Sequence, residues 1–373
     1  MTIRVLAPSP AVTLPARAYT DALVYERERR ELFAHSWVPV CTIAQVANPG
    51  DFVATSIAGE PVIVLRGDDG ELRALSNVCR HRASLLVREA GNCPRVLRCP
   101  YHGWTYGHDG GLVGVPEARG FDDLDRDAVS LPQFSLGVMA DLVCVNLDPD
   151  AEPLSGWFGE LETRLGALRL GRLTVQGPYV DEYDHNWKVI ADNYLEGYHI
   201  PVGHPGLLRM LDYKRYRPTP GRHHSWIDGP LREGSRSKDK LERLYQRAYE
   251  PMPGFPAELA SSWSYVHMFP STFIDIYPDQ IDTWQLQPMG LRRTRTISWV
   301  FTPEGGSLRA EAARKANWQI NEKVMDEDVE LCNGVQEGLE SLTYQRGVLN
   351  RNEAAVLNFH NMLREAIPGI DDT

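Results

Sequence analysis

Two cysteine–histidine pairs, close together in the chain, constrain this sequence more than any other feature. Cys79 and His81 form a Cys-x-His pair, and Cys99 and His102 form a Cys-x-x-His pair after seventeen intervening residues. Thiolate and imidazole groups bind zinc and iron, and tetrahedral zinc accepts two of each. A zinc site is therefore one interpretation of the four residues.

The mixed composition of each pair favours a two-iron cluster over zinc. If both cysteines bind one iron and both histidines bind the other, each loop supplies one ligand to each iron. This is the ligand set of a Rieske [2Fe–2S] centre, whose histidines raise its reduction potential. Gly103 permits close approach of the backbone, and Trp104 can shield the cluster from water. Cys93 falls outside the spacing, and we expect it not to be a ligand.

Cysteine usage and charge exclude several classes of protein. Only six cysteines are scattered over 373 residues, so a disulfide framework is not indicated and we expect reduced thiols in a cytoplasmic protein. The net charge is −11 and no dense basic cluster is present, which argues against nucleic acid as a partner. No apolar run approaches the ~20 residues that span a bilayer, so we expect no membrane association.

The pattern of strands and turns predicts two domains. The first, at 40–150, is a small antiparallel β domain with strands at 51–57, 61–66, 71–77, 95–99 and 142–146. The second, at 151–373 together with the segment 1–39, is α+β. It has helices at 155–170, 186–199 and 307–342, a polar, proline-interrupted stretch at 222–262, and strands within 263–302.

The stretch NWKVIADNYLEGYHIPVGH at 186–204 is the first candidate for a second metal site. Asp192, Glu196 and His199 are spaced at i, i+4 and i+7, which places them on one stripe of a helix. A solvated polar face is the ordinary interpretation of such a stripe. His199 and His204 would lie about 140° apart on a continuous helix. Both can meet one ion only if the helix ends near Pro201 and turns.

The late helix offers a carboxylate in EKVMDEDVELCNGVQEGL. Its apolar stripe is predicted to have Asp328 near the centre, while Asp326 and Glu327 point away. The stripe consists of Val324, Leu331, Cys332, Val335 and Leu339. A carboxylate in a buried stripe is costly unless it is paired or binds a metal. A surface acidic run is the alternative, and it fits Asp326 and Glu327 better than Asp328.

These motifs together resemble those of the Rieske non-haem iron oxygenases, the ring-hydroxylating oxygenase α-subunit family. The similar segments are CRHR, CPYHGWTYGHDGGL, the D-N-Y-x-E-x-Y-H-x-P-x-x-x-H stretch and the late aspartate, within about residues 35–340. Ala83 departs from the family, which usually has glycine there. The resemblance implies that Cys79, His81, Cys99 and His102 hold the cluster. It also implies that His199, His204 and Asp328 bind mononuclear Fe(II) as a facial triad with open positions for O₂.

The resemblance has further implications for fold and assembly. It implies an antiparallel sheet wrapped around a long C-terminal helix, the helix-grip or START-like arrangement, and a homotrimer. Glu196 would join the iron site to His102 of a neighbouring subunit. Apart from the resemblance, Asp192 is a candidate for orienting His199 or Glu196, and an acid on the helix surface is the alternative for it. Because the chain has no dinucleotide or flavin fingerprint, we expect electrons from NAD(P)H through a separate reductase or ferredoxin.

The expected reaction is hydroxylation or oxidative dealkylation of a small organic substrate, with an aromatic compound as the first expectation. A quaternary ammonium substrate is an alternative, suggested by Glu196 and by four strand aromatics, Trp263, Tyr265, Tyr277 and Trp284. Aromatic residues on strands are, however, more often part of a core. A Rieske electron carrier without oxygenase activity is a third possibility, but it leaves His199, His204 and Asp328 unexplained.

Overall fold

The computed structural model describes residues 11–233 and 237–372, and the chain folds into two compact units. One unit comprises Phe33–Gly171, and the other comprises the residues up to Leu32 together with those from Arg172 onward. The limits predicted above, 40–150 and 151–373, stay predictions, because compact units and folding domains need not share boundaries. Among the described residues, no helix is both long and apolar enough to cross a membrane.

The unit Phe33–Gly171 is built on antiparallel strands. A seven-stranded sheet has the order β1 (Val38–Thr42), β10 (Leu142–Asn146), β9 (Gln133–Met139), β4 (Leu72–Ser76), β3 (Glu60–Arg66), β2 (Asp51–Ile57) and β5 (Gly91–Asn92). A smaller sheet joins β6 (Leu97–Arg98), β7 (Thr105–Tyr106) and β8 (Leu112–Gly114). The predicted strands are therefore confirmed, although the one expected at 95–99 shortens to two residues.

The core of this unit supports the cysteine loops. The run Val62–Leu65 in β3 is fully buried, as expected for branched and apolar residues in a central strand. Ile63 and Leu65 belong to an apolar cluster that also contains Cys79, Cys99 and Trp104. The two loops that carry the cysteines are thus attached to a packed sheet rather than to a mobile surface.

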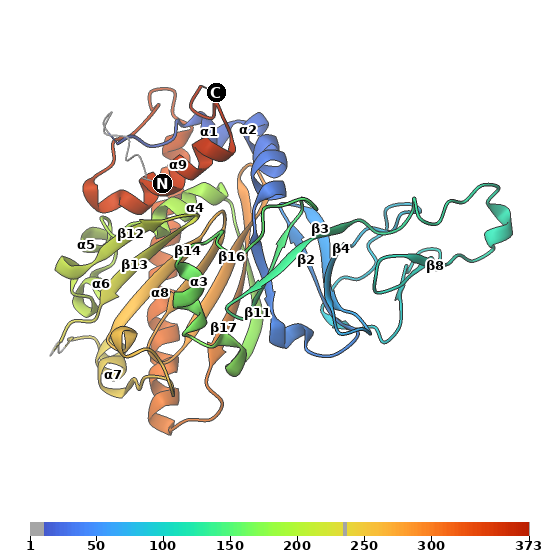
Figure 1. Cartoon of the computed structure of the whole chain (residues 1–373). Helices are drawn as coiled ribbons and strands as arrows, with labels where there is room; N and C mark the ends of the chain where they lie inside the picture. The colour runs from blue at the N-terminus through green and yellow to red at the C-terminus, as the bar shows by residue number, and fades with distance from the viewer. Residues whose placement is uncertain (1–10, 234–236, 373) are drawn as a thin grey trace. The chain divides into compact units, whose positions relative to one another are not determined.

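The second unit is an antiparallel sheet with a long helix. Its seven strands have the order β11 (Thr174–Tyr183), β17 (Arg293–Thr302), β16 (Ile281–Gly290), β15 (Thr272–Ile276), β14 (Ser262–Met268), β13 (His224–Pro230) and β12 (Arg217–Gly221). Helix α8 (Leu308–Leu339) runs along this sheet, and α7 (Lys240–Ala248) packs against α8 (Figure 1). The predicted α+β class and the arrangement of sheet and helix are confirmed.

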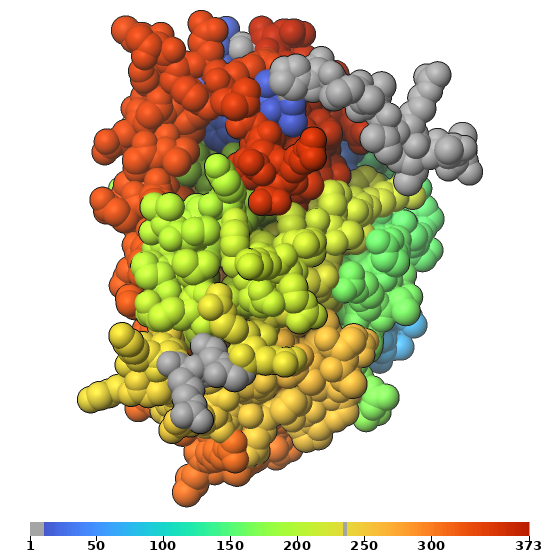
Figure 2. Space-filling view, turned by 90° about the vertical axis from the view of Figure 1, so that its left-hand side faces the viewer, coloured from blue at the N-terminus to red at the C-terminus, as the bar shows by residue number. Residues whose placement is uncertain are grey.

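Shorter helices complete this unit. They are α1 (Arg17–Thr20), α2 (Ala22–Arg27) and the π-helical turn η1 (Glu28–Leu32), then α4 (Trp187–Tyr194), α5 (Ile200–Gly203), α6 (Pro205–Met210) and α9 (Ala354–Ala366). In Figure 2 the yellow-green surface around α5, α6, β12 and β13 lies between the red C-terminal segment and the yellow surface around α7. Helix α9 packs against β12 and so covers an edge strand that would otherwise be open to pairing.

The polar, proline-interrupted stretch 222–262 contains β13 and α7. Two local predictions were wrong. The helix expected at 155–170 is only α3 (Leu161–Gly166). The helix expected at 186–199 ends at Tyr194. In addition, the long helix is not the last one, because α9 follows it.

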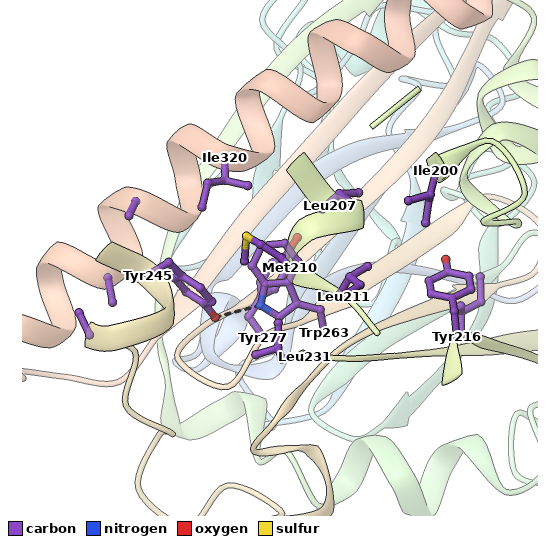
Figure 3. Packing of buried hydrophobic residues seen from close by; sticks show 14 residues of the cluster. Ile200, Leu207, Met210, Leu211, Tyr216, Leu231, Tyr245, Trp263, Tyr277 and Ile320 are labelled. Atoms are coloured by element: carbon purple, nitrogen blue, oxygen red, sulfur yellow. Dashed lines mark hydrogen bonds between the residues drawn. The ribbon is translucent and has the colours of Figure 1, made fainter. Parts of the chain in front are cut away.

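A second apolar cluster fills the space between the sheet and its helices. Figure 3 shows Trp263 of β14 donating a hydrogen bond of 3.0 Å to the hydroxyl of Tyr245 on α7. Ile320 of α8 and Met210 of α6 pack in the same cluster. Trp263 and Tyr277 are 0 % and 2 % exposed, so two of the four aromatics considered for a cationic substrate are core residues.

Candidate metal centres

The two cysteine loops have matching backbone turns. The Ala83 N–H donates to the carbonyl of Cys79 at 3.0 Å, and the Gly103 N–H donates to that of Cys99 at 3.1 Å. Ala83 and Gly103 both adopt left-handed φ values, 56° and 73°. For alanine this conformation costs about 1–2 kcal/mol. The departure from the usual glycine therefore preserves the turn at a modest cost in free energy.

The side chains in these loops gather the four predicted ligands. Cys79 and Cys99 are each 2 % exposed, and the rings of His81 and His102 lie edge to face with centroids 4.6 Å apart. Trp104 stacks on His81 at 4.9 Å. Within the part of the chain that the structure describes, the buried Nδ1 atom of His81 has no hydrogen-bond partner, as expected of a nitrogen that serves as a ligand. The donor set fits a two-iron cluster.

Hydrogen bonds in the same loops contact Cys79 and lower the pKa of Cys99. The Tyr106 hydroxyl lies 3.4 Å from the Cys79 sulfur and accepts a hydrogen bond of 3.0 Å from the Arg80 N–H. Burial raises the pKa of Cys99, but hydrogen bonds from the Tyr101 and His102 backbone outweigh it and lower the pKa overall. These hydrogen bonds therefore favour the thiolate form of Cys99, which is the form that binds metal. Sequence reasoning did not identify Tyr106, since a tyrosine near a motif has no distinctive spacing.

Cys93 lies apart from this set. Its sulfur is 3.6 Å from the Nε2 atom of His108, and the same Nε2 lies 2.9 Å from the Cys93 carbonyl oxygen. The expectation that Cys93 is not a ligand stays a prediction.

The second candidate centre begins where α4 ends. Beyond Tyr194 the chain forms a loop that includes Gly197, and a Cβ atom added there would lie 2.4 Å from a ring carbon of Tyr216. Only glycine allows this loop to rest on the tyrosine ring. His199 and His204 then flank the single turn α5, so they do not share a continuous helix. Their ring centroids are 4.9 Å apart.

His199, His204 and Asp328 come together as predicted. One ligand atom from each lies within 4.8 Å of the others, the arrangement of a potential metal site. The Nε2 atoms of His204 and His199 are 2.9 Å and 3.8 Å from Asp328 Oδ1. Asn193 donates to the same oxygen at 2.6 Å. Two imidazoles and a carboxylate on one side of an ion leave the opposite positions open, so this donor set fits iron in an oxygenase.

A carboxylate fixes the orientation of each histidine. Glu196 contacts His199 Nδ1, and Glu327 lies 2.8 Å from His204 Nδ1. Both Nε2 atoms are therefore directed to Asp328, in the way that carboxylates usually orient metal-binding histidines. Burial lowers the pKa of His204, but hydrogen bonds with Asp328 and Glu327 outweigh it and raise the pKa overall.

The prediction that Glu327 points away from the site was wrong. The predicted apolar stripe is displaced, because Leu331 and Val335 are 37 % and 52 % exposed. The buried face of α8 instead includes the polar residues Asn317 and Gln336. Glu327 lies seven residues after buried Ile320 and so shares that inward face. Hydrophobicity alone could not locate a face that contains several polar residues.

Asp192 does not contact either of the groups that we expected it to orient. It accepts a hydrogen bond of 2.6 Å from the Tyr19 hydroxyl, and its other oxygen lies 2.9 Å from His360 Nε2. The expectation that Asp192 orients His199 or Glu196 is therefore wrong. Asp192 connects α4 to α1 and α9, and it does not lie on one stripe with Glu196 because the helix has already ended.

Comparison with known proteins defines the class. Residues 36–134 match the Rieske [2Fe-2S] domain, and residues 170–369 match the catalytic domain of the ring hydroxylating alpha subunit. The chain belongs to this family of Rieske non-haem iron oxygenases. Its cofactors are a Rieske cluster and mononuclear iron, and it is an enzyme that incorporates oxygen from O₂.

Several relatives are similar over nearly the whole chain. The carnitine monooxygenase oxygenase subunit of Escherichia coli (strain K12) is 29% identical, covering 96% of this chain and 94% of the relative. The chloroplastic choline monooxygenase of Arabidopsis thaliana is 30% identical, with 95% and 82% covered. The crystal structure of the quaternary ammonium Rieske monooxygenase CntA with L-carnitine has a TM-score of 0.79 at 25% identity and covers 96% of each chain.

A more distant structure shares only the fold. Naphthalene 1,2-dioxygenase from Rhodococcus sp. gives a TM-score of 0.76 at 22% identity, with 95% of this chain and 94% of that chain covered. The helix-grip catalytic fold is therefore common to enzymes with very different substrates.

Proposed function

We propose that this protein is the terminal oxygenase of a Rieske system that oxidises a small quaternary ammonium compound. The observation that carries the proposal is the similarity to carnitine and choline monooxygenases, which extends over more than nine-tenths of the chain. The aromatic substrate expected first has weaker support, because the naphthalene dioxygenase shares the fold at only 22% identity. An electron carrier is not favoured, because the catalytic-domain match spans 170–369.

His199, His204 and Asp328 would hold the mononuclear iron, which supplies the activation of O₂ when it is bound. Glu196 and Glu327 keep the two imidazoles in the tautomer that presents Nε2. Asn193 of α4 donates a hydrogen bond to the Asp328 carboxylate and so fixes its position. The chain's own contribution is thus to fix three ligands and leave space for substrate and O₂.

Electrons would arrive from NAD(P)H through a separate reductase or ferredoxin and pass from the cluster to the iron of a neighbouring subunit in a homotrimer. His102 is exposed, and Glu196 is already in contact with His199 Nδ1, so the pair can form a bridge between subunits. Transfer between subunits is described for the solved quaternary ammonium relative. This path supports the proposed role of Glu196.

The test is turnover of the reduced enzyme under ¹⁸O₂ with choline, L-carnitine and γ-butyrobetaine, and with naphthalene for comparison. We expect labelled oxygen in a product of at least one cation and none in naphthalene. A labelled naphthalene diol without any oxidised cation would contradict the proposed substrate class. Reduction of the cluster without product from any compound would favour an electron carrier.

A further inference from the structure

One row of side chains on the sheet of the second unit is unusually polar. Tyr265 of β14 stands opposite Asp275 of β15, and Asp275 stands opposite Asp282 of β16. Facing residues in adjacent strands point to the same side of a sheet. Each of the three keeps part of its surface accessible, while their neighbours along these strands are mostly buried. The row is therefore a partly accessible polar strip within an otherwise buried part of the sheet.

Asp275 has no cationic partner among the residues that the structure describes. Its two oxygens accept hydrogen bonds from the Tyr194 hydroxyl at 2.6 Å and the Trp284 indole N–H at 3.1 Å. Burial raises the pKa of Asp275 to about 6, against the effect of these two donors, so the carboxylate is mainly ionised at neutral pH. Burial, together with the neighbouring Asp275, raises the pKa of Asp282 well above its ordinary value, so Asp275 is the ionised member of the row. An enclosed anion of this kind is costly unless a positive charge joins it.

Aromatic rings surround this carboxylate. The Tyr194 ring lies edge to face with Tyr265, Phe273 and Trp284, at centroid distances of 6.0, 4.7 and 5.1 Å. Trp284 also stacks on Phe273 at 4.3 Å. Unlike Trp263 and Tyr277, Tyr265 and Trp284 keep accessible surface. The four strand aromatics thus divide into two core residues and two that are partly accessible beside Asp275.

The row lies next to the metal centre. Tyr194 follows Asn193, whose amide donates to the ligand Asp328. Burial raises the pKa of the Tyr265 phenol, and the neighbouring Tyr216, Asp275 and Asp328 raise it further. A substrate held beside Asp275 would therefore be close to the iron ligands.

We propose that Asp275 is the anionic partner of the substrate's quaternary ammonium group, with Tyr194, Tyr265 and Trp284 supplying the aromatic surfaces around it. Such a cation has no N–H to donate and is recognised by charge and by aromatic faces. Asp275 suits this role. Its two oxygens already accept hydrogen bonds from Tyr194 and Trp284, so it would attract the cation through its negative charge and not by accepting another hydrogen bond. The inference rests on the proposed function and specifies its binding residue.

The experiment measures the binding of tetramethylammonium to the iron-loaded enzyme by calorimetry, for wild type, Asp275→Asn and Asp228→Asn. Asp228 is the matched control, because it also accepts an indole N–H, from Trp226 at 2.7 Å, but its position in the register places it on the other face of the sheet. We expect Asp275→Asn to weaken binding by about 30-fold or more. Asp228→Asn should leave the affinity within about twofold of wild type.

A neutral ligand separates loss of charge recognition from general damage. Choline and its uncharged carbon analogue, 3,3-dimethyl-1-butanol, differ only at the head group. The preference of wild type for choline should largely disappear in Asp275→Asn, with little change for the neutral alcohol. Equal affinity of wild type and Asp275→Asn for tetramethylammonium would overturn the inference while leaving the proposed substrate class intact. Failure of wild type to bind any of these cations would overturn both.

A measurement on the wild-type protein covers the case in which Asp275→Asn does not fold. Crystals soaked in tetramethylarsonium would reveal the arsenic by anomalous scattering. We expect the arsenic within about 6 Å of the rings of Tyr265 and Trp284 and beside the Asp275 carboxylate. Arsenic bound in the interior at another place would overturn the assignment.

Discussion

At the scale of single residues, the second metal centre depends on carboxylates that are not themselves ligands. Glu196 contacts the Nδ1 atom of His199, and Glu327 contacts the Nδ1 atom of His204. The Nε2 atoms of both histidines consequently face Asp328. Such partners fix the ring orientation and increase the basicity of the ligand. Their removal should therefore change metal binding or electron transfer without changing the ligands.

Glu327→Gln should weaken binding of the mononuclear iron by about 10- to 100-fold, because His204 then has at most a neutral amide oxygen in place of the carboxylate that orients it. Competition with a chelator, followed by iron analysis, measures this affinity. Asp326→Asn is the control, since Asp326 is an exposed neighbour on the same helix. Equal iron retention in the two variants would show that Glu327 does not support the site.

Glu196→Gln should retain both metal centres and still accept electrons at the cluster. In a single turnover with O₂, however, cluster reoxidation and product formation should both slow by about tenfold or more, because the proposed bridge to the neighbouring cluster is lost. Rapid-mixing spectroscopy and product analysis follow the two events. Glu330→Gln, at an exposed position of α8, serves as the control. Rates within a few-fold of wild type would remove Glu196 from the electron path.

At the scale of elements, α4 is held at both ends by α8. The Asn186 N–H at its start donates to Gln336 at 2.8 Å, and Asn193 near its end donates to Asp328. A buried ion pair between Lys188 of α4 and Glu28 of η1 adds an anchor from the N-terminal segment. Trp187 also donates to Glu28, at 2.9 Å. The helix that leads to the iron ligands is thus fixed by polar contacts that are remote in sequence.

Lys188→Met should lower the free energy of unfolding by about 3–5 kcal/mol, since it leaves Glu28 buried without its cation. The double variant Glu28→Gln/Lys188→Met should recover part of that loss, because no buried charge remains. Urea unfolding followed by circular dichroism measures both. Arg293→Met, which breaks an ion pair at the surface, should have little effect. If the losses in the double variant were simply additive, the two side chains would not form the pair described.

The elements that the sequence predicted well are those with strong local patterns. The long helix was expected at 307–342 and occurs at Leu308–Leu339, and the strands at 51–57 and 142–146 have the expected bounds. The face of α8 was displaced because inward polar residues such as Gln336 carry no hydrophobic signal. The pairing of β11 with β17 joins segments more than a hundred residues apart, and no local pattern specifies such a partner.

At the scale of the whole molecule, each centre is built within one compact unit. The predicted cluster ligands lie within 79–102, and two of the three predicted iron ligands, His199 and His204, are close together in the sequence, so short motifs were sufficient to predict them. Glu327 and Asp275 could not be identified in this way, because their contacts arise only when strands and helices come together. The residues proposed to bind the substrate likewise come from four separate elements, α4, β14, β15 and β16.

The central claim is that His199, His204 and Asp328 hold the mononuclear iron of a Rieske oxygenase. The most direct test combines iron analysis and electron paramagnetic resonance of Asp328→Ala with wild type and Asp326→Ala as references. We predict that wild type and Asp326→Ala contain the cluster irons and one further iron. Asp328→Ala should lose that iron and all product formation but keep a Rieske signal on reduction. Full iron content and turnover in Asp328→Ala, or zinc without a Rieske signal in wild type, would contradict the account.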